Sequence, residues 1–216
     1  MPGALRDGVS GVDDTCMESS ASLGEAPTTA ETPSSAGPDP GQGPAYPAVV
    51  PETTHLLLLR EMRAGDVPDV LDVQQPGAVL GLAEVFPQAR YPFPRDVIAQ
   101  RWVEEISTPG IDCLVVVRAG AVVGFAAARD AEFLHFGIAV ELWGTGIAQK
   151  AHDAVLDRMR DQGVERAWLR VFSGNHRGRR FYEKLGWVQS GEPTRSTFPP
   201  YAELLRYERP LGIRSP

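Results

Sequence analysis

The chain has 216 residues, of which 43% are hydrophobic, a length that suits one folded domain with a tail. Its formal net charge of −7 argues against a nucleic-acid-binding protein. No stretch approaches the ~18 apolar residues that a membrane span requires. The N-terminus carries no basic start followed by an apolar core, so no secretion signal is visible and we expect a cytoplasmic protein.

The acidic excess lies in the first 50 residues, which hold seven acidic side chains and one basic one, Arg6. This segment is rich in Pro, Gly, Ser, Ala and Thr, and it lacks Phe, Trp and Ile. Such a composition cannot bury enough apolar surface to offset chain entropy. We therefore predict a disordered acidic tail over 1–50, or an extension from a misplaced translation start, followed by a single domain over 51–216.

Strand and helix signals alternate at the start of the folded part. Residues 55–63 are predicted to form a first strand, and Asp66 is a good N-cap for a helix over 67–74. Pro76 is expected to end this helix. The elements predicted next are an aromatic, proline-rich loop over 78–94, a helix over 94–106, and a hairpin of apolar strands over 111–117 and 121–129.

A glycine turn joins a strand to a long amphipathic helix in the middle of the chain. The strand is predicted over 133–140 and the helix over 146–162, where apolar residues recur four apart until Gly163. The elements predicted after it are a strand over 166–172, a helix over 177–185, a strand over 187–190, a loop over 193–200 and a strand over 202–209. This order predicts a mixed α/β sheet in one domain.

The turn reads Trp143-Gly144-Thr145-Gly146-Ile147-Ala148. Exposed backbone N–H groups and the positive end of the helix dipole would make it a site for an anion such as a diphosphate. A Walker loop is excluded because no Gly-Lys-Ser/Thr follows the glycines, and a Rossmann turn because its third glycine falls on Gln149. The remaining interpretations are glycines for packing alone and a different phosphate-binding turn.

Two segments resemble the signatures of the GNAT superfamily of N-acetyltransferases. The turn matches its Gln/Arg-x-x-Gly-x-Gly/Ala pattern except at Trp143, and Asn175 to Trp187 resembles its Asn…Phe-Tyr-x-x-x-Gly-Phe helix. The resemblance covers about residues 56–209. It implies a mixed, mostly antiparallel sheet flanked by helices, with a splayed V between the central strands. It also implies acetyl-CoA as co-substrate and a monomer or homodimer.

In this family the backbone of the central strand pairs with the pantetheine arm, and the turn holds the pyrophosphate. Asn175 would contact the cofactor further along, and Arg179 could approach the phosphates, whereas Arg177 and Arg180 are expected to be solvated. The cofactor-binding residues implied by the resemblance are Ile138, Ala139, Val140, Trp143, Gly144, Thr145, Gly146, Ile147, Ala148, Asn175 and Arg179.

The implied reaction is direct attack of a primary amine on the thioester. An alkylammonium with a pKa near ~10.4 must lose a proton, and a departing thiolate with a pKa near ~8.5 gains from a proton donor. Tyr182 holds the family position of that acid, and a backbone N–H near Ile138 would meet the oxyanion. Glu132 and His135 both remain candidates for the base. Glu141 and His152 are expected to face solvent.

Substrate selection would come from loops around the V, where Tyr91, Phe93, Phe198 and Tyr201 could wall an amine pocket or could simply be core packing. A small amine, an antibiotic and a peptide N-terminus remain possible acceptors. No spacing of His, Cys, Asp and Glu suggests a metal site. High Ala, Gly, Pro and Arg usage suggests a bacterial source. The competing function is a non-catalytic acyl-CoA-binding sensor or interaction module.

Overall fold

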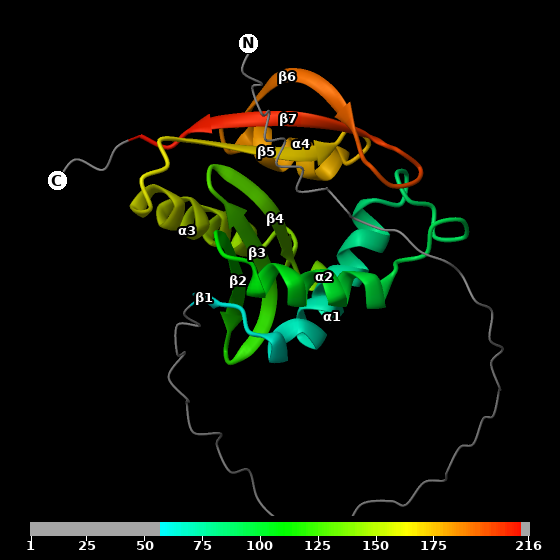
Figure 1. Cartoon of the computed structure of the whole chain (residues 1–216), viewed down its shortest axis with the longest axis horizontal. Helices are drawn as coiled ribbons and strands as arrows, with labels where there is room; N and C mark the ends of the chain where they lie inside the picture. Colours follow the sequence, from blue (N-terminus) through cyan, green and yellow to red (C-terminus); the bar gives the residue numbers. More distant parts are fainter. Residues whose placement is uncertain (1–56, 213–216) are drawn as a thin grey trace, which may run out of the picture.

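The computed structural model describes residues 57–212 (Figure 1). The predicted tail over 1–50, Cys16 and the start of the first predicted strand lie outside these residues. The strands are β1 (Leu57–Glu61), β2 (Ile111–Arg118), β3 (Ala121–Arg129), β4 (Glu132–Ile138), β5 (Arg166–Phe172), β6 (Val188–Arg195) and β7 (Glu203–Pro210). The helices are α1 (Val67–Gly81), α2 (Arg95–Ser107), α3 (Ile147–Asp161) and α4 (His176–Lys184), with short 3-10 turns at Ala64–Asp66 and Val140–Leu142.

The seven strands form one sheet in the order β1-β2-β3-β4-β5-β7-β6, and only the β4–β5 pair is parallel. Figure 1 shows β2 to β4 running along one direction while β5 and β7 cross above them at a steep angle. The sheet is therefore mixed and mostly antiparallel, and it opens between its two central strands. This confirms the predicted fold class.

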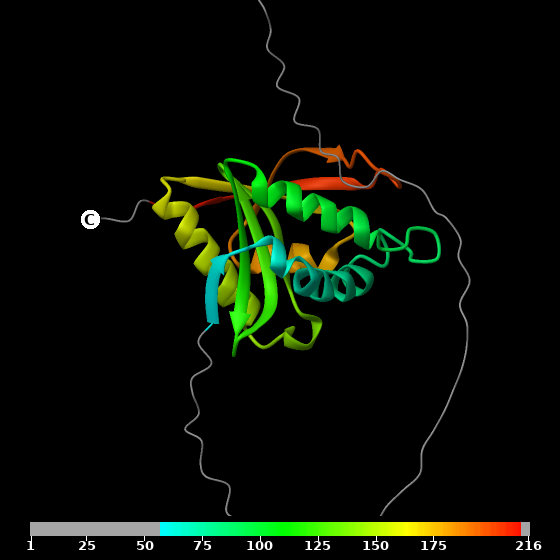
Figure 2. The same cartoon turned by 60° about the horizontal axis from the view of Figure 1, so that its bottom comes forward.

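Helices cover the two faces of the sheet separately. Helices α1 and α2 lie side by side on one face (Figure 2), where Val70, Trp102 and Val115 are wholly buried in a common core. Helix α3 covers the other face through Val155 and Met159. An apolar stripe on each helix explains this layering, because each helix must bury one side.

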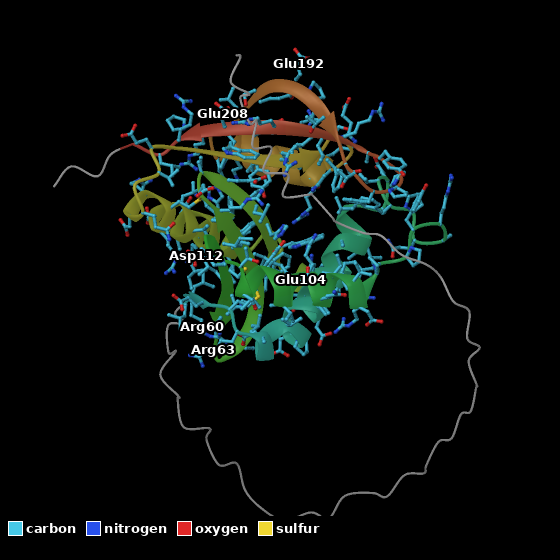
Figure 3. All side chains as sticks on the ribbon, viewed as in Figure 1. Arg60, Arg63, Glu104, Asp112, Glu192 and Glu208 are labelled. Atoms are coloured by element: carbon cyan, nitrogen blue, oxygen red, sulfur yellow. The ribbon has the colours of Figure 1, made fainter. Side chains whose placement is uncertain are left out.

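Charged side chains tie α3 to the first strands. Two guanidinium nitrogens of Arg158 donate to Asp112 on β2, which Figure 3 labels beside α3, and the Nη2–Oδ1 distance is 3.0 Å. Arg158 also reaches Glu61 on β1 at 3.4 Å. The orientation of α3 is thus held by ion pairs as well as by its buried stripe.

Two predicted boundaries were wrong. Helix α1 continues through Pro76 to Gly81, because packing of its second half against the glycine turn outweighs the lost backbone hydrogen bond. Strand β6 extends to Arg195, where a loop was predicted, because its register shifts between Ser190 and Thr194 and pairing with β7 then resumes. Among residues 57–212 no helix is long and apolar enough to cross a membrane.

Candidate active site

Strands β4 and β5 pair at a single position and then separate, which opens the sheet between them. Within residues 57–212 the only register pair joining them is Glu132 with Trp168, and no other described strand pairs with the rest of β4 on that side. On its other side Ala139 donates to Val123 of β3 at 2.9 Å. Because backbone groups alternate along a strand, the N–H and C=O of Ile138 point into the opening. A strand edge of this kind can pair with an extended, amide-bearing ligand.

A bulge shapes β4 beside the opening. The register of the β3–β4 pair shifts between Ala127 and Ala128, so that His135 pairs with Ala127 and Phe133 with Ala128. Bulges bend a strand and redirect its side chains. The predicted splayed V is present, and the bulge lies where β4 flanks it.

The glycine turn lies at the end of β4 and starts α3. Gly144 and Gly146 have φ of 82° and 84°, a left-handed conformation that favours glycine, and a Cβ on either would meet no atom within 4 Å. The first N–H groups of α3 have no partner inside the helix, and no acidic residue stands in its first turn. The turn therefore offers donors and a positive helix end to an anion.

Aromatic stacking brings α4 against β4. The Phe136 and Phe181 rings stack with centroids 5.9 Å apart and an interplanar angle of 14°. Asn175 caps α4, because its Oδ1 accepts from the Gly178 N–H at 2.9 Å. Gly178 leaves room for this cap, since a Cβ there would lie 2.6 Å from the Asn175 side chain. Tyr182 follows Phe181 in the chain, so these contacts place Tyr182 on the side of the opening that α3 covers.

Tyr182 packs among rings at the base of α4. Its ring is edge-on to Trp187 at 6.0 Å and lies 6.5 Å from His152. Within the described part of the chain its hydroxyl has no hydrogen-bond partner. Burial raises the pKa of Tyr182 above its ordinary value, so the hydroxyl keeps its proton and can donate a hydrogen bond.

The two candidate bases differ sharply in their surroundings. Glu132 is buried and accepts from two arginines, Arg129 at 2.8 Å and Arg170 at 3.0 Å. Both carboxylate oxygens of Glu132 therefore accept hydrogen bonds from arginines in an ion pair.

His135 lies on the face covered by α2. Its Nε2 is 3.0 Å from Glu105 Oε1, and its ring packs edge-on to Trp102. Burial and the charge of Arg101 lower the pKa of His135, which keeps the imidazole neutral near pH 7. If Nε2 carries the proton toward Glu105, Nδ1 is the free acceptor. Glu105 was missed because its sequence position on α2 gives no sign that it meets β4.

Two arginines of α4 differ in what their guanidinium groups contact. The guanidinium of Arg179 donates to the Tyr207 hydroxyl and the Ser173 carbonyl, both at 3.2 Å, and is directed toward β7. Arg177 instead lies over the Trp143 ring, 3.9 Å from its centroid, beside the glycine turn. Of these two arginines of α4, only Arg177 therefore contacts a residue of the turn, Trp143.

The four residues that could wall an amine pocket do not lie together in the structure. Phe198 is buried in a small cluster that Tyr91 packs against, and Phe93 packs against the core under α1 and α2. Tyr201 is exposed. None of the four lines the cavity of about 750 Å³ beside Glu132 and Trp168, or that of about 340 Å³ between α1 and Val140.

The expectation that His152 faces solvent was wrong, whereas Glu141 is exposed as expected. His152 is wholly buried under α3: its Nε2 accepts from the Trp187 indole at 2.9 Å, and its Nδ1 lies 2.9 Å from Asp153. Its position four residues before Leu156 on the apolar stripe was the available signal. Within residues 57–212 no group of three His, Cys, Asp or Glu side chains could hold a metal ion.

The splayed sheet thus places an unpaired strand edge beside a donor-rich turn that suits an anion. The Acetyltransferase (GNAT) family model matches residues 77–187, so the chain belongs to this family. No curated protein matches the chain.

Several solved structures share the fold. The spermidine N-acetyltransferase of Vibrio cholerae in complex with CoA and spermine has 19% identity and a TM-score of 0.56, and the match covers 72% of this chain and 95% of that one. The PaiA N-acetyltransferase of Thermoplasma acidophilum in complex with coenzyme A has 15% identity and a TM-score of 0.56, covering 71% and 99%. The ribosomal-protein-S18-alanine N-acetyltransferase of Escherichia coli has 14% identity and a TM-score of 0.54, covering 74% and 97%.

Proposed function

We propose that the protein transfers an acetyl group from acetyl-CoA to a primary amine of a small molecule or peptide, by direct attack in a ternary complex. One arrangement carries this proposal: the unpaired edge of β4 leads directly into the glycine turn that starts α3. The edge suits the amides of a pantetheine arm, and the turn suits its pyrophosphate. In the similar folds from Thermoplasma acidophilum and Vibrio cholerae, the bound ligand is coenzyme A.

In the proposed reaction the amine attacks the thioester carbonyl, and the C–N bond forms before the C–S bond breaks. The oxyanion would be met by the Ile138 N–H, which points into the opening. The thiolate would leave toward the Tyr182 hydroxyl. Because burial raises the pKa of Tyr182, full proton transfer to the thiolate is unfavourable, and the hydroxyl acts chiefly as a hydrogen-bond donor.

His135 is the better-supported base, acting directly or through water. Its imidazole is neutral, and Glu105 orients the ring, whereas the carboxylate of Glu132 is bound by two arginines. The amine would then approach from the face of α2, opposite to Tyr182. This separation lets one group accept a proton while another assists the leaving sulfur.

The acceptor class is proposed as an alkyl amine, of which a spermidine-like amine and a peptide N-terminus are two forms. Enzymes of similar fold act on spermidine and on a ribosomal-protein alanine, according to their names. A screen of amines, aminoglycosides and peptides separates these forms.

The test is a calorimetric titration of the full chain with acetyl-CoA, followed by measurement of free-thiol release with each acceptor class. Binding with release above the rate of acetyl-CoA hydrolysis would establish the enzyme. Binding without release on any amine would favour the alternative function, an acyl-CoA sensor. The observation that favours this alternative is that the Trp143 side chain occupies the open end of the V.

A further inference from the structure

Trp143 lies across the open end of the V and joins three elements. Its indole Nε1 donates to the carbonyl of Ile138 on β4 at 2.9 Å. The far edge of the ring lies against α1, where a Cβ on Gly77 or Gly81 would be 3.9 Å from it. On α4, the guanidinium of Arg177 lies 3.9 Å from the ring centroid. One side chain therefore links β4, α1 and α4 where β5 no longer pairs with β4.

The Ile138 carbonyl is the backbone acceptor that a ligand on the β4 edge would use. It points into the opening, because the adjacent Ala139 N–H donates to β3. The indole satisfies this carbonyl, and the ring lies in front of it. An extended amide chain that pairs with β4 as far as Ile138 would meet the ring, so both cannot occupy the site.

Arg177 is held by the same ring. Among the described residues it has no carboxylate partner, and its guanidinium rests on the Trp143 face in a cation–π contact. The residue that holds Arg177, Trp143, immediately precedes Gly144, the first glycine of the turn. If the ring moves, the guanidinium loses its aromatic partner at the place where a diphosphate would bind.

We propose that the Trp143 side chain occupies the cofactor cleft of the free protein and that the pantetheine arm of acyl-CoA displaces it, releasing Arg177 to contact the cofactor phosphates. This inference rests on the proposed function. Displacement breaks the indole hydrogen bond and the cation–π contact, which weakens binding. The released guanidinium gains a charge-assisted contact, which partly offsets that loss. Trp143 thus determines cofactor affinity, and Arg177 belongs to the phosphate site.

Trp143→Phe tests the first half of the proposal because it keeps an aromatic ring at this position and removes the indole N–H donor together with part of the ring system. Acetyl-CoA should bind about fivefold more tightly to this variant, the effect of one ordinary hydrogen bond that no longer has to be broken. Trp143→Gln, which also empties the ring position, should bind more tightly than native protein. Trp168→Phe on β5 is the matched control, and its affinity should equal that of native protein.

Arg177→Gln tests the second half. Loss of a phosphate contact should weaken acetyl-CoA binding about tenfold and make the affinity less dependent on salt. Arg180→Gln, an exposed arginine on the same helix, is the control and should leave the affinity and its salt dependence unchanged. Equal effects of the two arginine variants would overturn the assignment of Arg177.

Calorimetry measures these affinities on the full chain, and tryptophan fluorescence follows the displacement. Acetyl-CoA should change the emission of native protein, and Trp143→Phe should remove most of that change. Unchanged or weaker binding by Trp143→Phe, while native protein binds, would overturn the displacement and leave the proposed function intact. If acetyl-CoA binds to Trp143→Gln but not to native protein, this would support the proposal, because the Trp143 side chain would then block the cleft. Absence of binding in native protein and every Trp143 variant would overturn both proposals.

Discussion

The indole nitrogen of Trp187 donates a 2.9 Å hydrogen bond to Nε2 of His152, and both side chains are almost completely buried. This bond fixes the tautomer of His152, since Nε2 must accept and Nδ1 must carry the proton toward Asp153. It also joins the start of β6 to the middle of α3. The rings of Tyr182 and Phe181 pack against this pair.

The first prediction concerns the stability that this bond provides. Trp187→Phe leaves a buried imidazole nitrogen without its donor, so the free energy of unfolding should fall by about 1–3 kcal/mol. Urea unfolding of this variant, of His152→Leu and of the double variant completes a double-mutant cycle. Removing both partners should cost less than the sum of the single changes, by about 1 kcal/mol. If the losses of unfolding free energy in the two single variants add strictly in the double variant, the hydrogen bond does not contribute to stability.

The second prediction is a loss of stability in mild acid. Burial lowers the pKa of His152 and of His135, so the folded protein binds fewer protons at these sites than the unfolded chain. Their contribution is fully present above the unfolded pKa of about 6.5 and is lost as pH falls below it toward the folded values. Urea unfolding at pH 7.5 and 5.5 should show this fall. It should be smaller in His152→Leu, and an equal fall there would exclude His152 as a source.

The third prediction concerns the Tyr182 hydroxyl. Tyr182→Phe should reduce kcat about ten- to a hundredfold, because the developing thiolate loses a hydrogen-bond donor. Acetyl-CoA affinity and the unfolding midpoint should change little, since the hydroxyl has no partner among the described residues. Native turnover in Tyr182→Phe would exclude the assignment.

The fourth prediction separates the two candidate bases. Glu132→Gln should lower the free energy of unfolding by about 1–3 kcal/mol, less than for a wholly buried pair because Arg129 and Arg170 are partly exposed. His135→Gln should instead lower kcat/KM with the fold retained.

The pH profile provides the decisive readout for His135. Its lowered pKa predicts that kcat/KM of native protein falls in acid as the imidazole is protonated, with the midpoint of this limb below the ordinary histidine pKa of about 6.5. This acidic limb should be absent from the residual activity of His135→Gln. A limb that persists there and disappears in Glu132→Gln would assign the base to Glu132.

Local signals in the sequence were sufficient for the fold class and for the turn. The alternation of residues 166–172, the stripe of α3 and the β-branched hairpin each follow from a period that one segment carries by itself. Gly144 and Gly146 could be singled out because only glycine readily adopts the left-handed conformation that the turn needs. The two motif segments then led to the family that the comparison confirms.

Contacts between distant segments decided the state of the candidate residues. Glu132 and His135 look alike as bases within one strand, yet Arg170 on β5 binds the first, whereas Glu105 on α2 orients the second. Trp143 reads as a simple departure from a motif until the fold brings Gly77, Gly81 and Arg177 around its ring. Period and propensity depend on near neighbours along the chain, so they determined the elements and the backbone of the turn. Burial, ion pairing and occupation of the V depend also on partners that are distant in the sequence, such as Arg170 for Glu132, 38 residues away, and Glu105 for His135, 30 residues away. Only the tertiary structure brings these partners together.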